Sequence, residues 1–320
     1  MIWFDVLSKR SGKPRRLVLS AAAKVNLALE VLGRRDDGYH EIATVMQAVD
    51  LSDKLVLEEA DVLELRTTAS DVPTDGTNLA LKAALTLREM AGVSRGVKIT
   101  LDKRIPVAAG LGGGSTDAAA VLVGLNRLWG LGWSAARLAE AAVRLGMDVP
   151  FFLHGGAAMG TGRGERLEPL ASSALALVLV NPRVAASTAE IYGGVVASMY
   201  SDGAQARGMA AALRSRQPAR VAASLGNTLE RVASARYREV EQMEAALLAA
   251  GALGAQMSGS GLTVFGIARS FDHARQIRAR VTRARWGCWA VRTLRGPAGS
   301  DDCLRIVRGD DLPDQRRVGV

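Results

Sequence analysis

The feature that constrains this chain most is a cluster of glycines within five residues, formed by Gly110, Gly112, Gly113 and Gly114. Residues 97–101 before the cluster alternate between apolar and polar, as a half-buried strand does. Residues 118–129 after it are apolar and rich in helix formers. The cluster is therefore predicted to join a strand to a helix whose N-cap chemistry comes from Ser115, Thr116 and Asp117.

This junction predicts an anion site, most often one for phosphate. Glycine lacks a Cβ, so its backbone can take positive φ and a ligand can approach its N–H groups closely. The first turn of a helix also has unpaired N–H groups and a partial positive charge. The stretch is not a Walker A loop, because no Gly-Lys-Ser/Thr follows, and it lacks the G-x-G-x-x-G spacing of a Rossmann fingerprint. A tight structural turn is the alternative interpretation.

Composition limits the classes of protein to consider. The chain has 320 residues, enough for two domains with a core each. No apolar run reaches the ~18 residues that cross a bilayer. Two cysteines, Cys288 and Cys303, and three single histidines give neither a disulfide framework nor a zinc site, so a reduced, cytoplasmic setting is expected.

The net charge of +9 leaves several partners open. It fits a nucleic acid, an anionic small molecule, or solubility alone. Part of the excess lies in residues 9–16, and part in and directly after the predicted helix 270–284, at Arg275, Arg278, Arg280, Arg283 and Arg285. These arginines fall on several sides of the helix without interleaved aromatics, which favours a solvated surface.

Polar residues in apolar surroundings mark a second candidate feature. Lys24 and Asn26 are two apart in a predicted strand, so they share one face. Asp148 lies among apolar residues just before Pro150. Because buried charges need partners, a Lys24–Asp148 pair is one interpretation. A lysine at a strand end reaching solvent, and an aspartate that caps a helix, are the alternatives.

Further expected elements place these motifs. Tyr39 and His40, in a charged turn, suit a planar heterocycle, which one ring can stack on and the other can hydrogen-bond. Strands are expected at 17–32 with a small-residue break, at 45–57 with a turn at 50–53, and at 97–101, 176–180 and 289–294. Helices are expected at 79–91, 134–145, 237–253 and 270–284, a tight turn at 160–164, and a flexible connection within 201–219.

Three separated segments resemble the GHMP kinase superfamily. They are residues 23–40 with Gly-Arg-Arg-x-Asp-Gly-Tyr-His, the glycine stretch 106–117, and Met-Ser-Gly-Ser-Gly at 257–261. The resemblance covers about residues 17–295. It implies an α+β, two-domain fold, with an N-terminal ribosomal-protein-like domain, a C-terminal ferredoxin-like domain and the active site in the cleft between them.

The domain limits expected on this basis divide the chain into four parts. These are a basic extension at 1–16, an ATP-binding domain at 17–168, a C-terminal domain at 169–296 and a tail at 297–320.

The resemblance also implies an activity. The turn at 33–40 and the segment that begins at Asp148 are similar to superfamily members that phosphorylate the 2-hydroxyl of a cytidine diphosphate-linked methylerythritol in the non-mevalonate isoprenoid pathway. Lys24 and Asp148 are implied as the catalytic pair. ATP and Mg²⁺ are implied as cofactors, with Ser115 as a candidate Mg²⁺ ligand. Thr228 stands where an aspartate is common, so no role is carried over to it.

Binding roles are implied for two sets of residues. Nucleotide contacts are implied for Asn78, Lys103, Pro106, Gly110, Leu111, Gly112, Gly113, Gly114, Ser115 and Thr116. Substrate contacts are implied for Asn26, Tyr39, His40, Asp148, Thr188, Tyr192, Ser258 and Gly259. Tyr39 and Tyr192 would sandwich the cytosine, with His40 on its edge.

Three alternatives stay open at this point. The first is a sister kinase for homoserine, mevalonate or a sugar, whose substrate has no base to stack. The second is a nucleic-acid-binding protein, and the third a ligand sensor without catalysis. The expected partners are ATP and a small molecule, with neither nucleic acid nor membrane, and the chain is expected to be a monomer or a weak homodimer.

Overall fold

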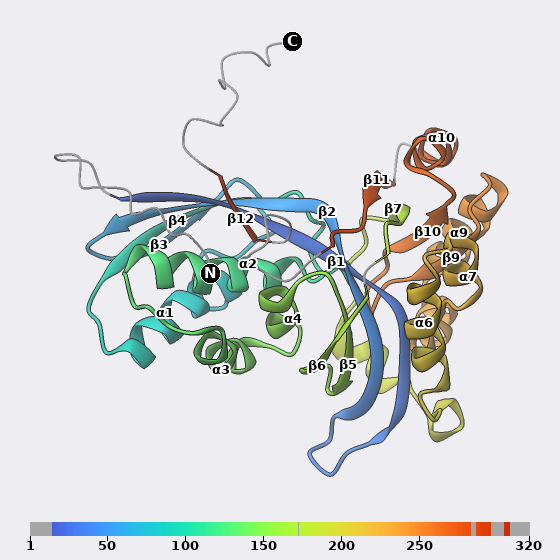
Figure 1. Cartoon of the computed structure of the whole chain (residues 1–320), viewed down its shortest axis with the longest axis horizontal. Coiled ribbons are helices and arrows are strands. Elements are labelled where there is room, and N and C mark those ends of the chain that lie inside the picture. The colour runs from blue at the N-terminus through green and yellow to red at the C-terminus, as the bar shows by residue number, and fades with distance from the viewer. Residues whose placement is uncertain (1–14, 172, 283–285, 296–303, 308–320) are drawn as a thin grey trace.

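Two long antiparallel strands run through both halves of the molecule (Figure 1). The computed structural model describes residues 15–171, 173–282, 286–295 and 304–307. Strand β1 (Arg16–Arg34) and strand β2 (His40–Ala60) pair along nearly their whole length. From Leu17 to Val31 every residue of β1 except Ser20 is buried, so both faces of the strand are covered and it contributes to the cores of both halves of the chain.

The larger sheet is completed by shorter strands on both sides of this pair. Its order is β12-β1-β2-β4-β3, with β5 paired to β2 and β6, and β8 paired to β1. The bounds are β3 (Leu63–Thr67), β4 (Gly96–Asp102), β5 (Ala157–Gly162), β6 (Arg166–Leu170), β8 (Gly226–Asn227) and β12 (Leu304–Val307). β4 and β5 pair with opposite ends of β2.

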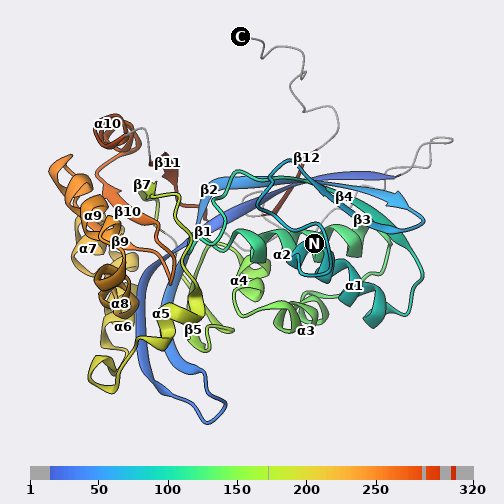
Figure 2. The same cartoon turned by 180° about the vertical axis from the view of Figure 1, so that it is seen from behind.

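Four helices of the N-terminal half lie on one side of this sheet (Figures 1 and 2). They are α1 (Leu79–Ala91), α2 (Gly113–Leu128), α3 (Ala135–Leu145) and α4 (Val149–His154). α1 begins where predicted because Asn78 caps it, accepting from the N–H of Ala80, and Ser134 caps α3 in the same way. α2 is buried against the sheet along most of its length, as its run of small and branched apolar residues requires.

The C-terminal half builds a second, four-stranded antiparallel sheet in the order β11-β7-β10-β9. The strands are β7 (Ala176–Asn181), β9 (Gly254–Met257), β10 (Val264–Ala268) and β11 (Gly287–Arg292). The helical elements are α5 (Thr188–Gly193), η1 (Ala197–Met199), α6 (Ala204–Ser215), α7 (Pro218–Ala223), α8 (Thr228–Arg236), α9 (Glu239–Ala249) and α10 (Phe271–Val281).

A shared core joins the two halves. Val25 and Leu27 of β1 pack in one cluster with Leu177 of β7, Phe265 of β10 and Met209 of α6. All of these side chains are fully buried. The two sheets are therefore joined by buried side chains and not only by the connecting chain. This packing holds in place the elements that surround the site.

Two predictions about the long strands are wrong for one reason. The sequence suggested a break in β1 at its small residues and a turn in β2 at 50–53, but both strands continue. Ala22 pairs with Ser52 and Ala23 with Val49, so the two extra residues of β2 form a bulge opposite the small residues. The turn signal in the sequence marks this bulge.

The flexible connection expected within 201–219 is also wrong. That stretch contains α6 and the start of α7. The buried carboxylate of Glu30 accepts the N–H of Ala206 at 2.8 Å in the first turn of α6, and Met209 and Leu213 pack into the shared core. These partners lie far away in the sequence, so the polar composition alone does not reveal them.

The chain ends differ from expectation where the structure describes them. Strand β1 begins at Arg16, which was expected to be the last residue of the basic extension. In the expected tail, Leu304–Val307 forms a strand that pairs with β1 at Val18–Ala21. The predicted turn at 160–164 is the β5–β6 hairpin. Most of the basic extension and tail, with Arg283, Arg285 and Cys303, lies outside the described residues. Over the described residues, no helix has the length and hydropathy that crossing a membrane needs.

A carboxyl pair in the C-terminal half yields a stability prediction. Burial and the Glu230 carboxylate raise the pKa of Glu244, on α9, to about 9. The pKa in the unfolded chain is about 4.3, so folding holds this proton more tightly. The stability that results is present at low pH and is lost as the pH rises towards 9. We expect Glu244→Gln to gain stability relative to the parent at pH 9 but not at pH 5, in urea unfolding. If the difference in unfolding free energy between Glu244→Gln and the parent were the same at pH 5 and pH 9, this prediction would be contradicted.

Candidate active site

The predicted site residues gather around one cleft of about 1050 Å³ that is lined by both halves of the chain. The lining includes most of the residues singled out in the sequence: Lys24, Asn26, Tyr39, His40, Asn78, Lys103, Pro106, Gly110, Gly112, Gly113, Gly114, Ser115, Asp148, Thr188, Tyr192 and Gly259. Leu111, Thr116 and Ser258 are buried just behind this surface and do not line it.

The glycine cluster joins β4 to α2, as predicted, but the predicted N-cap is wrong. The N-cap is Gly112, at φ +71°, and it makes no side-chain cap bond. Ser115, Thr116 and Asp117 already lie inside the first turns of the helix. A side-chain cap would have occupied a first-turn amide, so its absence leaves the N–H groups at the start of α2 available to an anion.

Glycine is required in the cluster by close packing as well as by φ. A Cβ on Gly110 would lie 2.0 Å from the carbonyl oxygen of Ser258, and one on Gly112 would lie 2.6 Å from the ring of Phe152. The backbone of Gly110 therefore touches the second glycine turn, 257–261, without a side chain between them. This contact brings the turn of the C-terminal half against the loop of the N-terminal half.

The Lys24–Asp148 pair forms across the cleft wall. Lys24 Nζ lies 3.4 Å from Asp148 Oδ2; the lysine side chain is 5% exposed and the aspartate 36%. Asp148 precedes α4 but makes no side-chain cap bond, so the capping alternative fails. The carboxylate thus has one buried cation beside it and an open side towards the cleft.

A polar network holds the lysine in place. Lys24 Nζ donates to Asn26 Oδ1 at 2.5 Å, which shows that the two side chains share a face, as their spacing predicted. Asn26 Nδ2 donates in turn to the hydroxyl of Thr44 at 2.8 Å. The backbone N–H of Asn26 donates to Ser258 Oγ, and that hydroxyl donates to the carbonyl of Gly110. The ammonium position is therefore determined by β1, β2 and both glycine segments.

Tyr39, His40 and Tyr192, which we call the aromatic group, line another part of the cleft wall. The rings of His40 and Tyr192 stack with centroids 5.5 Å apart, while Tyr39 is 54% exposed. Burial and the nearby Arg34 lower the pKa of His40, so its ring is neutral near pH 7 and offers one donor and one acceptor. Burial and the charge of Asp148 raise the pKa of Tyr192, which keeps its phenol protonated. Thr188 bonds to Ser260 of the second turn at 2.9 Å.

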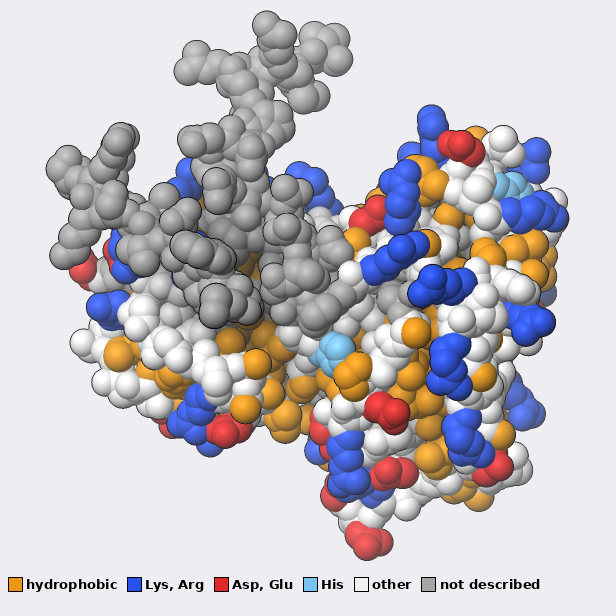
Figure 3. All heavy atoms as spheres, viewed as in Figure 1, with side chains coloured by type: hydrophobic (Ala, Val, Ile, Leu, Met, Phe, Trp, Pro, Cys, Tyr) orange, Lys and Arg blue, Asp and Glu red, His pale blue; other side chains and the backbone are white. Residues whose placement is uncertain are grey.

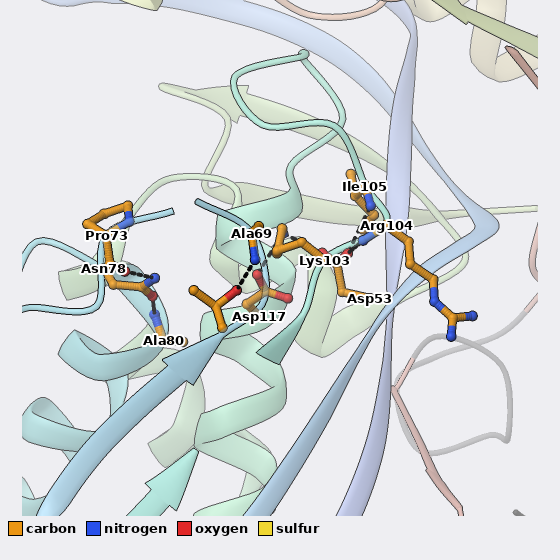
Figure 4. Close-up of polar contacts among 10 residues, drawn as sticks. Asp53, Ala69, Pro73, Asn78, Ala80, Lys103, Arg104, Ile105 and Asp117 are labelled. Carbon is orange, nitrogen blue, oxygen red and sulfur yellow. Dashed lines mark hydrogen bonds and ion pairs between the residues drawn. The ribbon is translucent and has the colours of Figure 1, made fainter. Parts of the chain in front are cut away.

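Lys103 lies in a buried triad directly beneath the glycine loop (Figure 4). Its ammonium pairs with Asp53 and, at 2.8 Å, with Asp117. Asp53 also accepts the backbone N–H groups of Arg104 and Ile105. Burial would lower the pKa of Lys103, but Asp117 and Asp53 together raise it, so the lysine is charged. A Cβ on Gly113 would lie 3.1 Å from its Nζ.

The triad sets the electrostatics of the loop. Burial raises the pKa of Asp117 to about 7, Asp53 adds to the rise, and Lys103 opposes it. An aspartate in the first turns of α2 would otherwise repel an anion bound at that helix end. Lys103 offsets this charge and keeps the base of the loop close to neutral.

Two lining or supporting residues were missed by the sequence reasoning. Arg163, at the β5–β6 hairpin, lines the cleft and stacks its guanidinium 3.6 Å from the centre of the Tyr39 ring. The Gly-x-Gly around it was interpreted only as a turn. Asp53 was assigned to a turn, and no local signal reveals that it pairs with a lysine fifty positions later.

The donor set for a metal is sparse. Among the described residues, no group of three or more His, Cys, Asp or Glu side chains could enclose a metal ion. Mg²⁺ commonly takes only one or two protein ligands and uses phosphate oxygens and water for the rest. The hydroxyl of Ser115 and the open side of Asp148 line the cleft and fit such a limited role.

Family models match both halves of the chain. One, described as the GHMP kinases N terminal domain, matches residues 78–156, which contain the glycine loop and Asp148. The other, described as GHMP kinases C terminal, matches residues 209–287, which contain the second glycine turn.

Relatives match most of the chain. A 4-diphosphocytidyl-2-C-methyl-D-erythritol kinase of Pelotomaculum thermopropionicum is 48% identical, over 82% of this chain and 93% of its own length. The enzyme of the same name from Symbiobacterium thermophilum is 48% identical, over 85% and 98%. A crystal structure of 4-(cytidine 5'-diphospho)-2C-methyl-D-erythritol kinase is similar with a TM-score of 0.74, at 37% identity over 86% of this chain and 98% of that one.

A homoserine kinase from Cytophaga hutchinsonii also shares the fold. Its crystal structure gives a TM-score of 0.72 at 20% identity, over 96% of this chain and all of that one. At this identity the similarity extends to the fold alone.

The triad predicts unequal effects of two substitutions. Lys103→Met leaves two buried carboxylates without their cation and should cost about 3–5 kcal/mol of unfolding free energy. Asp117→Asn keeps the shape and an acceptor for Lys103, and it replaces a group that is already part protonated near pH 7, so its loss should be much smaller. Urea unfolding at pH 7 measures both. Equal losses would contradict the assigned charge states.

Proposed function

The chain belongs to the GHMP kinases, in the family of the 4-diphosphocytidyl-2-C-methyl-D-erythritol kinases, and from this premise we propose how its residues perform the reaction. It is an ATP-dependent small-molecule kinase that phosphorylates the 2-hydroxyl of 4-diphosphocytidyl-2-C-methyl-D-erythritol, a step of the non-mevalonate route to isoprenoid precursors. The observation that carries the mechanism is the buried Lys24 ammonium 3.4 Å from Asp148, beside the glycine loop.

Asp148 is proposed as the base. Phosphoryl transfer depends on positioning and charge neutralisation more than on covalent chemistry. The open side of Asp148 can accept the proton of the substrate hydroxyl as the hydroxyl oxygen attacks the γ-phosphorus of ATP, the bond from that phosphorus to the β–γ bridging oxygen breaks, and ADP leaves. Lys24, whose ammonium lies 3.4 Å from Asp148 Oδ2 at the same cleft wall, neutralises charge on the transferred group. Asn26 holds the lysine and can orient the substrate.

The glycine loop is proposed to bind the phosphates of ATP. The uncapped start of α2, from Gly113 to Ser115, offers N–H groups and a helix dipole. Pro106, Gly110, Leu111, Gly112 and Thr116 would shape the loop, while Asn78 and Lys103 border it. Mg²⁺ would bind with ATP, with Ser115 as its protein ligand, and would neutralise phosphate charge.

The aromatic group is proposed to select the substrate. Tyr39 and Tyr192 present ring faces and His40 a neutral polar edge, which together suit a cytosine. In this structure His40 rests on Tyr192 and Arg163 on Tyr39, so the base would enter by displacing one of these contacts. Thr188 and Gly259 would border the polyol, whereas Ser258, buried behind the cleft surface, would hold the turn in place rather than contact the substrate.

A small molecule is proposed as the partner in preference to nucleic acid. On the face drawn in Figure 3, the Lys and Arg side chains of the C-terminal half are spaced along its length rather than packed into one cluster. Several are paired with acids, as Arg236 is with Glu190 and Arg275 with Asp272.

We also propose that residues 17–168 and 169–296 are the two functional domains and that the enzyme works in the cytoplasm, as a monomer or weak homodimer.

The proposed base gives a direct prediction. Asp148→Asn should lower kcat by about 10²–10⁴-fold, the usual contribution of a general base, while the Kd for an ATP analogue stays near that of the parent. Asp272→Asn, an exposed ion-paired aspartate on α10, is the matched control and should keep full activity. A near-normal kcat in Asp148→Asn would show that another group takes the proton.

A competition experiment tests the substrate. The purified enzyme should phosphorylate the cytidyl substrate in a mixture with homoserine and mevalonate, and Tyr39→Ala should raise KM more than it lowers kcat, because the ring binds the base and not the reacting atoms. Phosphorylation of homoserine or mevalonate with the cytidyl substrate left intact would overturn the assigned specificity.

A further inference from the structure

The second glycine turn, 257–261, contacts both parts of the reaction machinery. Ser258 Oγ accepts the N–H of Asn26 at 3.2 Å and donates to the carbonyl of Gly110 at 3.0 Å. Gly259 has φ +62°, and a Cβ on it would lie 3.4 Å from Lys24 Nζ. A shift of this turn therefore moves the surroundings of the catalytic lysine and of the glycine loop together.

The turn has little free space on the loop side. A Cβ on Gly261 would lie 2.1 Å from the backbone nitrogen of Gly110. Backbone meets backbone here, so no flexible side chain can absorb a displacement. Beyond the β9–β10 pairing and the bond from the N–H of Ser258 to the carbonyl of Thr263, a further restraint on the turn can come from its other side.

Asn227 supplies that restraint. It is 8% exposed and stands immediately before α8. Its Nδ2 donates to the carbonyls of Met257 at 2.9 Å and Gly259 at 2.8 Å, and its Oδ1 accepts the N–H of Leu229. One amide thus caps the helix and ties two carbonyls of the turn to it. Glu230, on the same helix, accepts the N–H of Met257 at 2.7 Å.

The start of α8 is itself fixed to the catalytic strand. The two-residue strand β8, which includes Asn227, pairs in parallel with β1 at Ala28 and Leu29. Thr228 Oγ1 accepts the N–H of Val31 at 3.4 Å. The contacts therefore form a closed circuit that runs from β1 through Asn227 to the turn and back to Asn26 on β1.

We propose that Asn227 is a positioning residue for phosphoryl transfer, acting through the 257–261 turn on Lys24, Asn26 and Gly110. This inference rests on the proposed function. Asn227 contacts the turn rather than the cleft, so it sets geometry and does not bind ATP or substrate. Misplacement of a catalytic group by about 1 Å can lower a rate about 10²-fold, so a loosened turn should reduce kcat.

Two variants separate positioning from helix capping. Asn227→Ser keeps a capping hydroxyl but cannot reach both carbonyls, and Asn227→Asp keeps the shape and the cap but replaces the donor. The control is Ser270→Ala, which removes the cap of α10 at an exposed position. Both Asn227 variants should lose about 10- to 100-fold in kcat, with a much smaller change in the Kd of an ATP analogue, whereas Ser270→Ala should keep its kcat.

A double-substitution cycle tests the route of the effect. If Asn227 acts through the turn, Asn227→Ser combined with Ser258→Ala should lose less kcat than the product of the two separate losses. Fully multiplicative losses would overturn the proposed route.

Amide hydrogen exchange tests the coupling without any substrate. Peptides covering 257–261 and 109–112 should exchange faster in Asn227→Ser and unchanged in Ser270→Ala. If the parent enzyme did not phosphorylate the cytidyl substrate but the variants showed this exchange pattern, the proposed function would be wrong, while the coupling between Asn227 and the turn would be supported. Unchanged exchange, a kcat within twofold of the parent, or an equal loss in Ser270→Ala would each overturn the positioning role.

Discussion

The ion pair between Lys24 and Asp148 is the interaction on which the site depends. An ammonium that is 5% exposed needs a partner, and its partner comes from the start of α4, more than a hundred residues away. The pair exists only because β1 runs beneath the glycine loop and α4 packs against α2. In the proposed mechanism the loop binds phosphate, as it could in many kinases, and the pair beside it carries the chemistry.

A second constraint is the contact between two glycine segments. Gly110 and Gly261 touch backbone to backbone, so the N-terminal and C-terminal halves meet without an intervening side chain. A packed core of β1, β7, β10 and α6 holds the same junction from behind. Both contacts lie beside the cleft, and Asn227, which lies outside the cleft, bonds the turn of the C-terminal half to the start of α8.

The parts that sequence predicted well are those with local signals. Asn78 and Ser134 announce two helices, and the glycine cluster announces a strand-to-helix junction. Burial arguments offered the Lys24–Asp148 pair as one interpretation, because charges in apolar segments need partners, and the structure selects it over the alternatives. The missed features depend on distant partners. In the sequence Asp53 resembles a turn residue, and only the structure shows that it pairs with Lys103. Likewise α6 resembles a linker in the sequence, and only the structure shows that Glu30 accepts the N–H of Ala206 in its first turn. Nothing local shows that Gly112, rather than Ser115, ends the loop.

The most direct test of the central claim is a double-mutant cycle on the pair, measured as the single-turnover rate with saturating ATP. If Lys24 and Asp148 act as one unit, the Lys24→Met, Asp148→Asn double variant should be no slower than the slower single variant, because each single change already removes the function of the pair. Losses that multiply in the double variant would show two independent contributions and contradict the paired mechanism.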